Sequence, residues 1–154
     1  MNWLLELLTN PFLLTSLSSW FVAQVLKTII HAIETQKLDF ERLIGDGGMP
    51  SGHTATVTSL SAFCGLSFGF GSFQFAVTAI LAIIVCHDAM GVRLETGKQA
   101  EVINELTKTI ELLSSKEWTQ EKLKEFVGHT PIQVLAGILL GIVNALVMYF
   151  FVFN

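Results

Sequence analysis

Three short polar segments border the apolar stretches of this sequence: residues 47–54, 87–93 and 128–131. They contain the residue types that bind and transfer phosphate. His53 and His129 can each act as a nucleophile or an acid, and Arg93 can clamp phosphate oxygens. Brought to one face, these groups would meet the requirements of phosphoryl transfer through a phosphohistidine.

The first segment also offers a candidate anion site in its backbone. Two glycines, Gly47 and Gly48, precede Ser51 and Gly52 at the start of an apolar stretch. A glycine-rich turn that enters a helix leaves backbone N–H groups unpaired, with the positive end of the helix dipole behind them. As the simpler alternative, Ser51 could serve only as a helix N-cap, and His53 only as a structural histidine.

The charged residues near the other polar segments have simpler alternatives as well. Asp88 and Arg93 flank Gly91 at a membrane boundary, where charge is costly unless paired or functional, and they could form only an ion pair. Lys27 and His31 are four residues apart and share a helix face, but Lys27 could simply extend to the lipid headgroups. Because no ligand spacing such as HExxH is present, we expect neither a metal nor another cofactor.

Four apolar stretches could carry these segments across a membrane. Half of the chain is apolar and only 14% is charged, a balance too apolar for an ordinary soluble domain. Spans of about 20 residues are needed to cross a bilayer, and the stretches near this length are 11–33, 51–70, 73–90 and 131–153. We therefore expect an all-α integral membrane protein, residues 1–154 forming a single bundle of about four transmembrane helices. Residues 69–72 would turn the second and third spans into a hairpin.

The stretch 51–70 is rich in Ser, Thr and Gly, so we expect it to pack among the other helices rather than face lipid. The same small residues would also allow the bundle to pair with a second copy as a homodimer. Cys64 and Cys86 lie at different depths, which favours buried thiols over a disulfide. The mild net charge of -4 without a basic run argues against nucleic acid and leaves the lipid bilayer as the expected partner.

Two longer polar connections, 34–50 and 91–130, join the spans. The second is expected to be a helical insertion with one amphipathic helix that lies on the membrane or caps the bundle, and a short second helix at 119–126. Its apolar face consists of Val102, Ile103, Leu106, Ile110 and Leu113. Both connections contain Lys or Arg, whereas the termini contain none, so the positive-inside rule predicts cytoplasmic connections and both termini outside. The apolar residues before residue 10 suit a stretch at the membrane interface.

The ordered polar segments resemble a known family. The sequence from Gly48 to His53 looks like the PSGH motif of the type 2 phosphatidic acid phosphatases (PAP2) and vanadium haloperoxidases. The whole chain resembles the divergent branch of that superfamily, with further matches at Asp88, at 91–93 and at 128–131. The resemblance covers roughly residues 10–150 and implies a PAP2-like helical arrangement.

The resemblance implies a role for each site residue. It makes His129 the nucleophile and His53 the acid that protonates the leaving oxygen. Phosphate oxygens would be held by Arg93, by Lys27 and by the N–H groups of Ser51 and Gly52. Lys27 lacks the arginine and proline that follow it in the family motif, and Arg42 is the candidate substitute for that arginine. Supporting positions are Asp88 and Gln133.

Two departures from the superfamily pattern bear on activity. The insertion separates Arg93 from His129, and Gln133 occupies the place of the aspartate that supports the nucleophilic histidine. An amide can accept the histidine's hydrogen bond but cannot stabilise a cationic ring, which predicts a slow enzyme. The resemblance thus favours a phosphatase for a lipid or isoprenoid phosphate or diphosphate at the cytoplasmic face. A catalytically inactive protein that binds phosphorylated headgroups for recognition, transport or scaffolding is the alternative, and a haloperoxidase is a more distant one.

Overall fold

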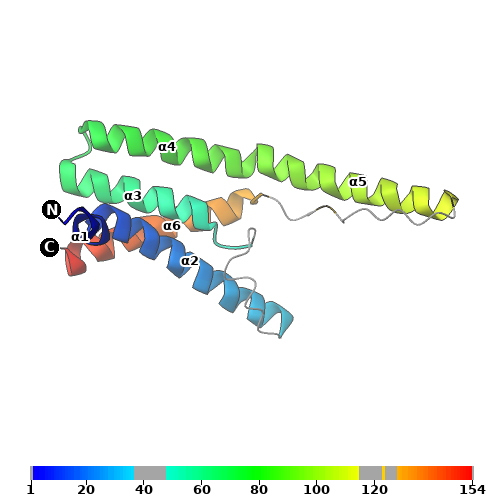
Figure 1. The fold of residues 1–154 in the computed structure, drawn as a ribbon, viewed down its shortest axis with the longest axis horizontal. Coiled ribbons are helices and arrows are strands. Elements are labelled where there is room, and N and C mark those ends of the chain that lie inside the picture. Colours follow the sequence, from blue (N-terminus) through cyan, green and yellow to red (C-terminus); the bar gives the residue numbers. More distant parts are fainter. Residues whose placement is uncertain (1, 37–47, 115–122, 124–127, 154) are drawn as a thin grey trace.

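A computed structural model of the chain describes residues 2–36, 48–114, 123 and 128–153, and within these residues every regular element is a helix. Figure 1 shows a bundle at one end and a single long helix that leaves it. The elements are α1 (Trp3–Leu8), α2 (Pro11–Thr35), α3 (Gly52–Phe68), α4 (Phe73–Met90), α5 (Val92–Ser114), α6 (Pro131–Val147) and a terminal π-helical turn, η2 (Met148–Val152).

The central element of the bundle is α3, which packs against α2, α4 and α6. It owes this place to small side chains, because they let three neighbouring backbones approach closely. Its buried residues are Gly52, Thr54, Ala55, Ser59, Ser61, Phe63, Cys64 and Gly65. The prediction that this Ser-, Thr- and Gly-rich stretch packs among other helices is confirmed.

The closest approach is between α3 and α6. A Cβ atom added at Gly137 would lie 2.7 Å from the carbonyl oxygen of Ser51, and one added at Gly141 would lie 2.6 Å from that of Ala55. Both distances are shorter than any side chain allows. The two glycines are four residues apart on one face of α6, so they form a groove that fits the α3 backbone.

A polar cluster holds the same helices together farther from the polar segments. The Nδ2 atom of Asn144 in α6 donates to the carbonyl oxygen of Thr15 at 2.9 Å and lies 3.1 Å from both Ser18 Oγ and Ser59 Oγ. These contacts reach α2 and α3 at once. Interhelical hydrogen bonds of this kind stabilise helix packing in a medium that contains no competing water.

The predicted hairpin between the second and third spans is confirmed. Gly69 follows α3 with φ +86°, a left-handed conformation that favours glycine, and Ser72 caps α4 by accepting a hydrogen bond from the N–H of Phe75. This turn lies at the same end of the bundle as both chain termini (Figure 1). The polar segments therefore lie at the opposite end.

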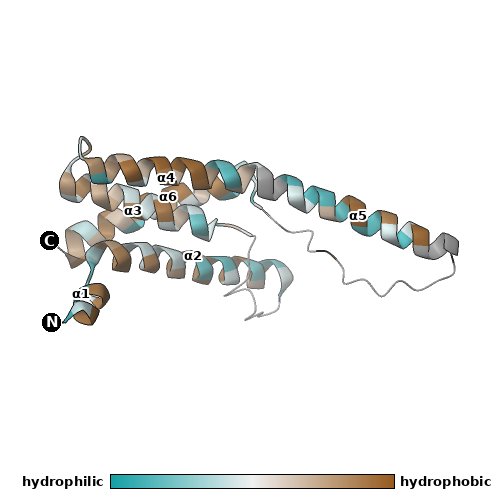
Figure 2. Ribbon diagram, turned by 45° about the horizontal axis from the view of Figure 1, so that its top comes forward, coloured by the Kyte–Doolittle hydropathy of each residue, from teal (hydrophilic) through white to brown (hydrophobic). Residues whose placement is uncertain are grey.

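Three helical stretches are long and apolar enough to cross a membrane: Pro11–Thr35, Phe73–Ile110 and Pro131–Val152. The stretch expected as the second of about four spans is not among them. Its helix, α3, has only 17 residues, because Ser51 is its N-cap and Gly69 ends it. Figure 2 shows the contrast with α4, which is hydrophobic along most of its length while α3 is paler.

The amphipathic helix of the insertion is present as α5, but it does not cap the bundle. It continues α4 almost in line and extends away from the ends of α2, α3 and α6 (Figures 1 and 2). The reason lies at Gly91, which turns the chain only slightly, since its N–H still bonds to the carbonyl oxygen of His87 as in a helix. Apart from Leu123, the predicted short helix at 119–126 lies outside the described residues.

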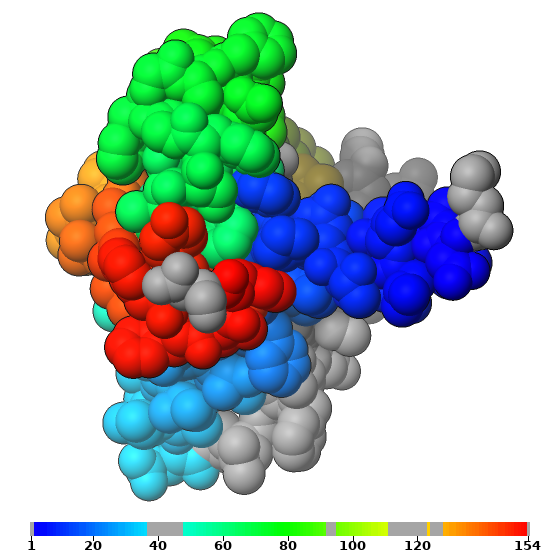
Figure 3. Space-filling view, turned by 90° about the vertical axis from the view of Figure 1, so that its left-hand side faces the viewer, coloured from blue at the N-terminus to red at the C-terminus, as the bar shows by residue number. Residues whose placement is uncertain are grey.

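The apolar residues before residue 10 form α1, which stands out sideways from the bundle in Figure 3. All of its side chains are exposed, including Trp3, Leu4 and Leu7. Asn10 separates it from α2 by accepting hydrogen bonds from Phe12 and Leu13. An exposed tryptophan beside leucines suits the interfacial position that the sequence predicts.

Candidate phosphate site

Two backbone hydrogen bonds bring the three polar segments together. The N–H of Ser51, just before α3, donates to the carbonyl oxygen of Gln133 in the first turn of α6 at 3.1 Å. The N–H of His129, just before α6, donates to the carbonyl oxygen of Ala89 at the end of α4 at 3.0 Å. The predicted convergence of these segments at one end of the bundle is confirmed.

Lys27 joins this end from α2 and is only 5% exposed. It packs against Gly48, where a Cβ atom would lie 3.2 Å from the lysine Cγ. Gly48 also has φ +81°, so glycine is favoured there by conformation as well as by space. A charge this deeply buried is costly unless it is paired or functional, so Lys27 is a candidate contact for an anion.

A cavity of about 130 Å³ opens beside Lys27. Its walls come from the C-terminal third of α2, the turn before α3 and the first turn of α6, and they consist of Lys27, Ile30, His31, Glu34, Gly48, Met49 and Gln133. The volume far exceeds the ~10–15 Å³ that one water requires. The cavity can therefore accept a small polar group from the aqueous side of the bundle.

His129 lies next to this cavity through Gln133. The histidine is 6% exposed, and its Nδ1 atom is 3.4 Å from Oε1 of Gln133. The same oxygen accepts a hydrogen bond from the N–H of Thr130 at 3.0 Å, while the Thr130 hydroxyl caps the N–H of Gln133. Gln133 thus combines a helix-capping role with contact to the histidine ring.

The Ser51 amide has a structural role. Because its N–H bonds to Gln133, it is not directed at a ligand, and its side chain caps α3 through the N–H of Thr54 at 3.5 Å. This is the N-cap alternative that the sequence left open. Gly52 is buried, with the Trp20 indole 3.5 Å from the place of a Cβ atom, so the predicted backbone donors do not form an open anion nest around Ser51.

The other predicted site residues lie outside the cavity wall or outside the described part of the molecule. His53 is exposed on the first turn of α3 and does not belong to the cavity wall around Lys27. Asp88 is half-buried in the last turn of α4, one residue before the carbonyl group that His129 contacts. Arg42 and the Arg93 side chain lie outside the described part of the molecule. No cluster of three His, Cys, Asp or Glu residues that could hold a metal occurs among the described residues.

Sequence reasoning missed part of the cavity wall. It placed His31 on the face of Lys27 but gave it no role, and it did not consider Glu34 or Met49. The signal for the first two was present, because residues 27, 31 and 34 are spaced by four and three and so follow one face of α2. Met49 carries no such signal, because the turn before α3 alone positions it.

Comparison with known proteins agrees with this architecture. The sequence profile of the divergent PAP2 family matches residues 8–144, which is most of the chain. The chain is also 46% identical to a protein described as "Uncharacterized membrane protein YuiD" from Bacillus subtilis (strain 168), over 96% of this chain and 99% of that one. No solved structure matches it significantly. The chain therefore belongs to the divergent PAP2 family of membrane proteins.

Proposed function

We propose that this member of the divergent PAP2 family is a membrane phosphatase that acts on a lipid or isoprenoid phosphate or diphosphate. Phosphate would pass through a phosphohistidine on His129. The observation that carries the proposal is the contact between the buried His129 ring and Gln133, whose side chain also lines the Lys27 cavity.

The hydrogen bonds around Gln133 favour the tautomer that a nucleophile needs. Oε1 of Gln133 accepts from the N–H of Thr130, which identifies this atom as the amide oxygen rather than the nitrogen. The Nδ1 atom of His129 lies 3.4 Å from the same oxygen, which favours the tautomer that carries the proton on Nδ1. Nε2 is left with its lone pair, as attack on phosphorus requires.

The phosphate would be held by cations. Lys27 lines the cavity, and the family resemblance adds Arg93, with Arg42 as a further candidate. Their role is to neutralise the charge on the equatorial oxygens as the phosphoryl group moves. Asp88, at the end of α4, would help to orient these cationic side chains.

The reaction then has two steps. In the first, Nε2 of His129 bonds to phosphorus while the phosphorus–oxygen bond to the leaving group breaks, and the leaving oxygen takes a proton, which the resemblance assigns to His53. In the second, water attacks the phosphohistidine and releases inorganic phosphate. A diphosphate substrate would leave a lipid monophosphate in the first step.

The amide side chain of Gln133 determines the turnover rate that we expect. A carboxylate at this position would stabilise the cationic ring that forms after attack, whereas a neutral amide holds the ring without compensating its charge. In serine proteases the change from carboxylate to amide costs about four orders of magnitude in kcat because the histidine takes the wrong tautomer, so this figure is an upper bound where the amide oxygen keeps the right one. We therefore expect slow turnover in the wild-type protein and faster turnover in a Gln133→Glu variant.

We place the site at the cytoplasmic face, with four spans. α3 would be the fourth, crossing within a shell formed by α2, α4 and α6, which explains how a short helix with so many hydroxyl groups avoids lipid. Apart from Lys27, the Lys and Arg residues support this orientation, since they occur in the two connections on the site's side. Both termini would then lie outside.

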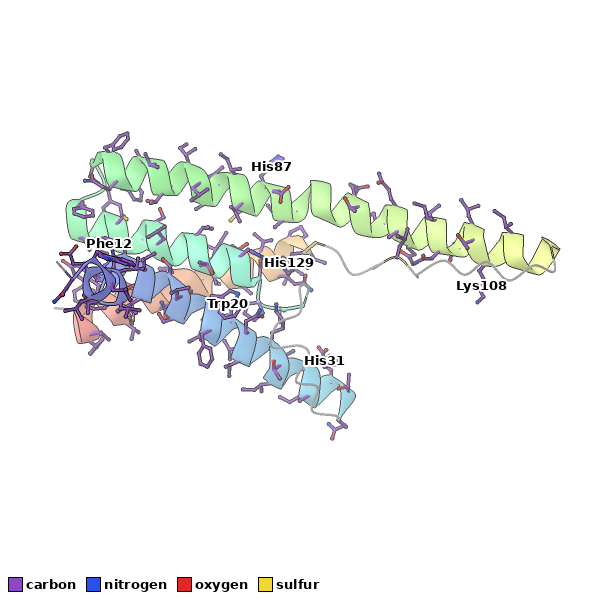
Figure 4. The ribbon with its side chains drawn as sticks, in the orientation of Figure 1. Phe12, Trp20, His31, His87, Lys108 and His129 are labelled. Carbon is purple, nitrogen blue, oxygen red and sulfur yellow. The ribbon has the colours of Figure 1, made fainter. Side chains whose placement is uncertain are left out.

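Phosphate release from detergent-purified protein tests the proposal. The substrates are a panel of lipid phosphates, isoprenoid phosphates and diphosphates, and the variants are His129→Ala and His87→Ala. His87 is the matched control, because it is an exposed histidine on the outer side of α4 (Figure 4). We expect release that falls at least 100-fold in His129→Ala and is retained in His87→Ala. Unchanged hydrolysis in His129→Ala would contradict the mechanism.

A second candidate function is binding without turnover, and Gln133 is the observation that favours it. A protein that keeps Lys27 and its cavity without the carboxylate could recognise or carry a phosphorylated headgroup. Vesicles that contain phosphatidic acid or an isoprenoid phosphate would then bind the protein more tightly than vesicles of neutral lipid. Binding with no release from any substrate, in wild type and in Gln133→Glu, would favour this candidate over the enzyme.

A further inference from the structure

The long helix α5 leaves the bundle and presents an apolar face that no described helix covers. Its extensive helix contacts are with α4 alone, which it continues (Figure 1). Val102, Ile103, Leu106 and Ile110 are between 46% and 57% exposed. Such a face on a helix outside the bundle calls for a partner.

The spacing on this face is that of a coiled coil. Ile103, Leu106, Ile110 and Leu113 follow one another at intervals of three, four and three residues. In heptad terms the isoleucines occupy the a positions and the leucines the d positions. β-Branched residues at a with leucine at d favour parallel, two-stranded coiled coils.

The charges of α5 avoid this seam. Glu101, Glu105 and Lys108 fall on the outer positions c and f, and Glu95 pairs with Lys98 within the helix at 2.6 Å. The positions that flank the seam are uncharged, among them Val102 and Thr107. Two copies could therefore meet along the seam without bringing like charges together.

Leu123 is bonded to a different face of α5. The Asn104 side chain donates to the carbonyl oxygen of Leu123 at 2.9 Å and accepts from its N–H at 3.1 Å. At ~100° per residue, Asn104 lies about 130° around the helix from the centre of the seam. These contacts at Leu123 leave the seam exposed.

We infer that α5 pairs with α5 of a second copy of this chain in a parallel two-stranded coiled coil. Two copies inserted in one membrane in the same orientation project α5 in the same direction, which raises their local concentration and sets a parallel arrangement. The four seam residues span only residues 103–113, about one and a half heptads, which is too short to pair strongly between free chains and therefore depends on this confinement.

The membrane surface suits α5 less well as a partner. Residues 92–114 contain four Glu against three Lys or Arg, so an anionic leaflet does not attract the helix. The small residues of α3, which suggested pairing from the sequence, are already used by α6 within one bundle. The α5 seam is thus the surface that favours a dimer.

Disulfide crosslinking in native membranes tests the pairing. A Leu106→Cys variant places a thiol in the seam, and Lys108→Cys places one on the outer face of the same helix. The wild-type chain, with Cys64 and Cys86, gives the background. We expect oxidation to crosslink Leu106→Cys at least five-fold more than Lys108→Cys. Equal crosslinking of the two variants would overturn the inference.

Particle mass in lipid nanodiscs gives an independent readout. Leu106→Glu places two carboxylates in the seam and should convert a dimer to a monomer, whereas Lys108→Glu should remain dimeric. A wild-type monomer, or a mass that Leu106→Glu does not change, would overturn the inference. A fluorophore attached to the Leu106→Cys variant gives a further check. If the protein is monomeric and the fluorescence changes on contact with lipid, the apolar face rests on the membrane and the inference is overturned.

Discussion

The helices α3 and α4 are neighbours of nearly equal length, yet they differ in composition and in the number of residues that they bury. α3 contains many Ser, Thr and Gly residues and buries eight of its residues, whereas α4 is rich in large aliphatic side chains and buries only Ala89. In a water-soluble protein the more apolar helix would be the buried one. Here lipid accommodates the large apolar side chains, so close packing and hydrogen bonding, rather than hydrophobicity, decide which helix is central.

The glycine contact between α6 and α3 should be the most sensitive part of this arrangement. In a Gly141→Ala variant the new methyl group would lie 2.6 Å from the Ala55 carbonyl oxygen, so the helices must separate. We expect a loss of about 3 kcal/mol in the free energy of unfolding, measured by SDS titration in mixed micelles. Leu139→Ala, on the exposed side of α6, is the control and should change stability far less.

An Asn144→Ala variant would remove the polar cluster that joins α2, α3 and α6. The substitution deletes the donor to Thr15 and the contacts with Ser18 and Ser59, and leaves their oxygens with fewer partners. We expect a loss of about 1–2 kcal/mol, at the upper end for hydrogen bonds between membrane helices. Val143→Ala, an exposed neighbour on α6, provides the comparison, and equal losses in the two variants would contradict this role for Asn144.

Gly48→Ala tests the turn before α3. The residue has φ +81° and contacts Lys27, so alanine should destabilise the protein by about 1 kcal/mol. It should also displace the lysine and weaken binding of inorganic phosphate, measured by calorimetry. Gly71→Ala is the matched control, because a Cβ atom there meets open space and φ is not positive. A stable Gly48→Ala protein with normal phosphate binding would exclude the proposed importance of this contact.

The smallest effect is expected on the outer face of α4. Ile83 is exposed in the bundle, so Ile83→Ala exchanges one lipid-facing side chain for another and should change the free energy of unfolding by less than about 0.5 kcal/mol. A large loss in lipid bilayers would show that this face packs against protein, and the contrast between α3 and α4 would need revision.

Much of this fold follows from the sequence, and the departures have physical causes. The lengths of the apolar stretches predicted the three helices that the structure identifies as candidate spans. The turn residues Gly69 and Ser72 indicated the hairpin. Length alone overestimated α3, because the caps at Ser51 and Gly69 shorten it. The direction of α5 was not predictable, since the amphipathic pattern fixes a face but not the angle at Gly91.

The sequence predicted that the polar segments converge at one end of the bundle, but it did not predict the contacts between their residues. The order of the polar segments and the alternation of spans were enough to bring Ser51, His129 and Ala89 together. No pattern could show that the Ser51 amide would bond to Gln133, because the path of the turn before α6 decides this. The exposure of His53 likewise depends on the rotation of α3, which small residues on several faces leave undetermined.

The most direct test of the central claim is detection of phosphate on His129. The protein is incubated with the lipid phosphate that it hydrolyses best, or with the whole panel, quenched in alkali to preserve phosphohistidine, and analysed by peptide mass spectrometry. The account predicts a phosphoryl group on His129, with less accumulation in Gln133→Glu if water attack then becomes faster, and none on His53 or His87. Turnover without phosphate on His129, or phosphate on a different histidine, would contradict it.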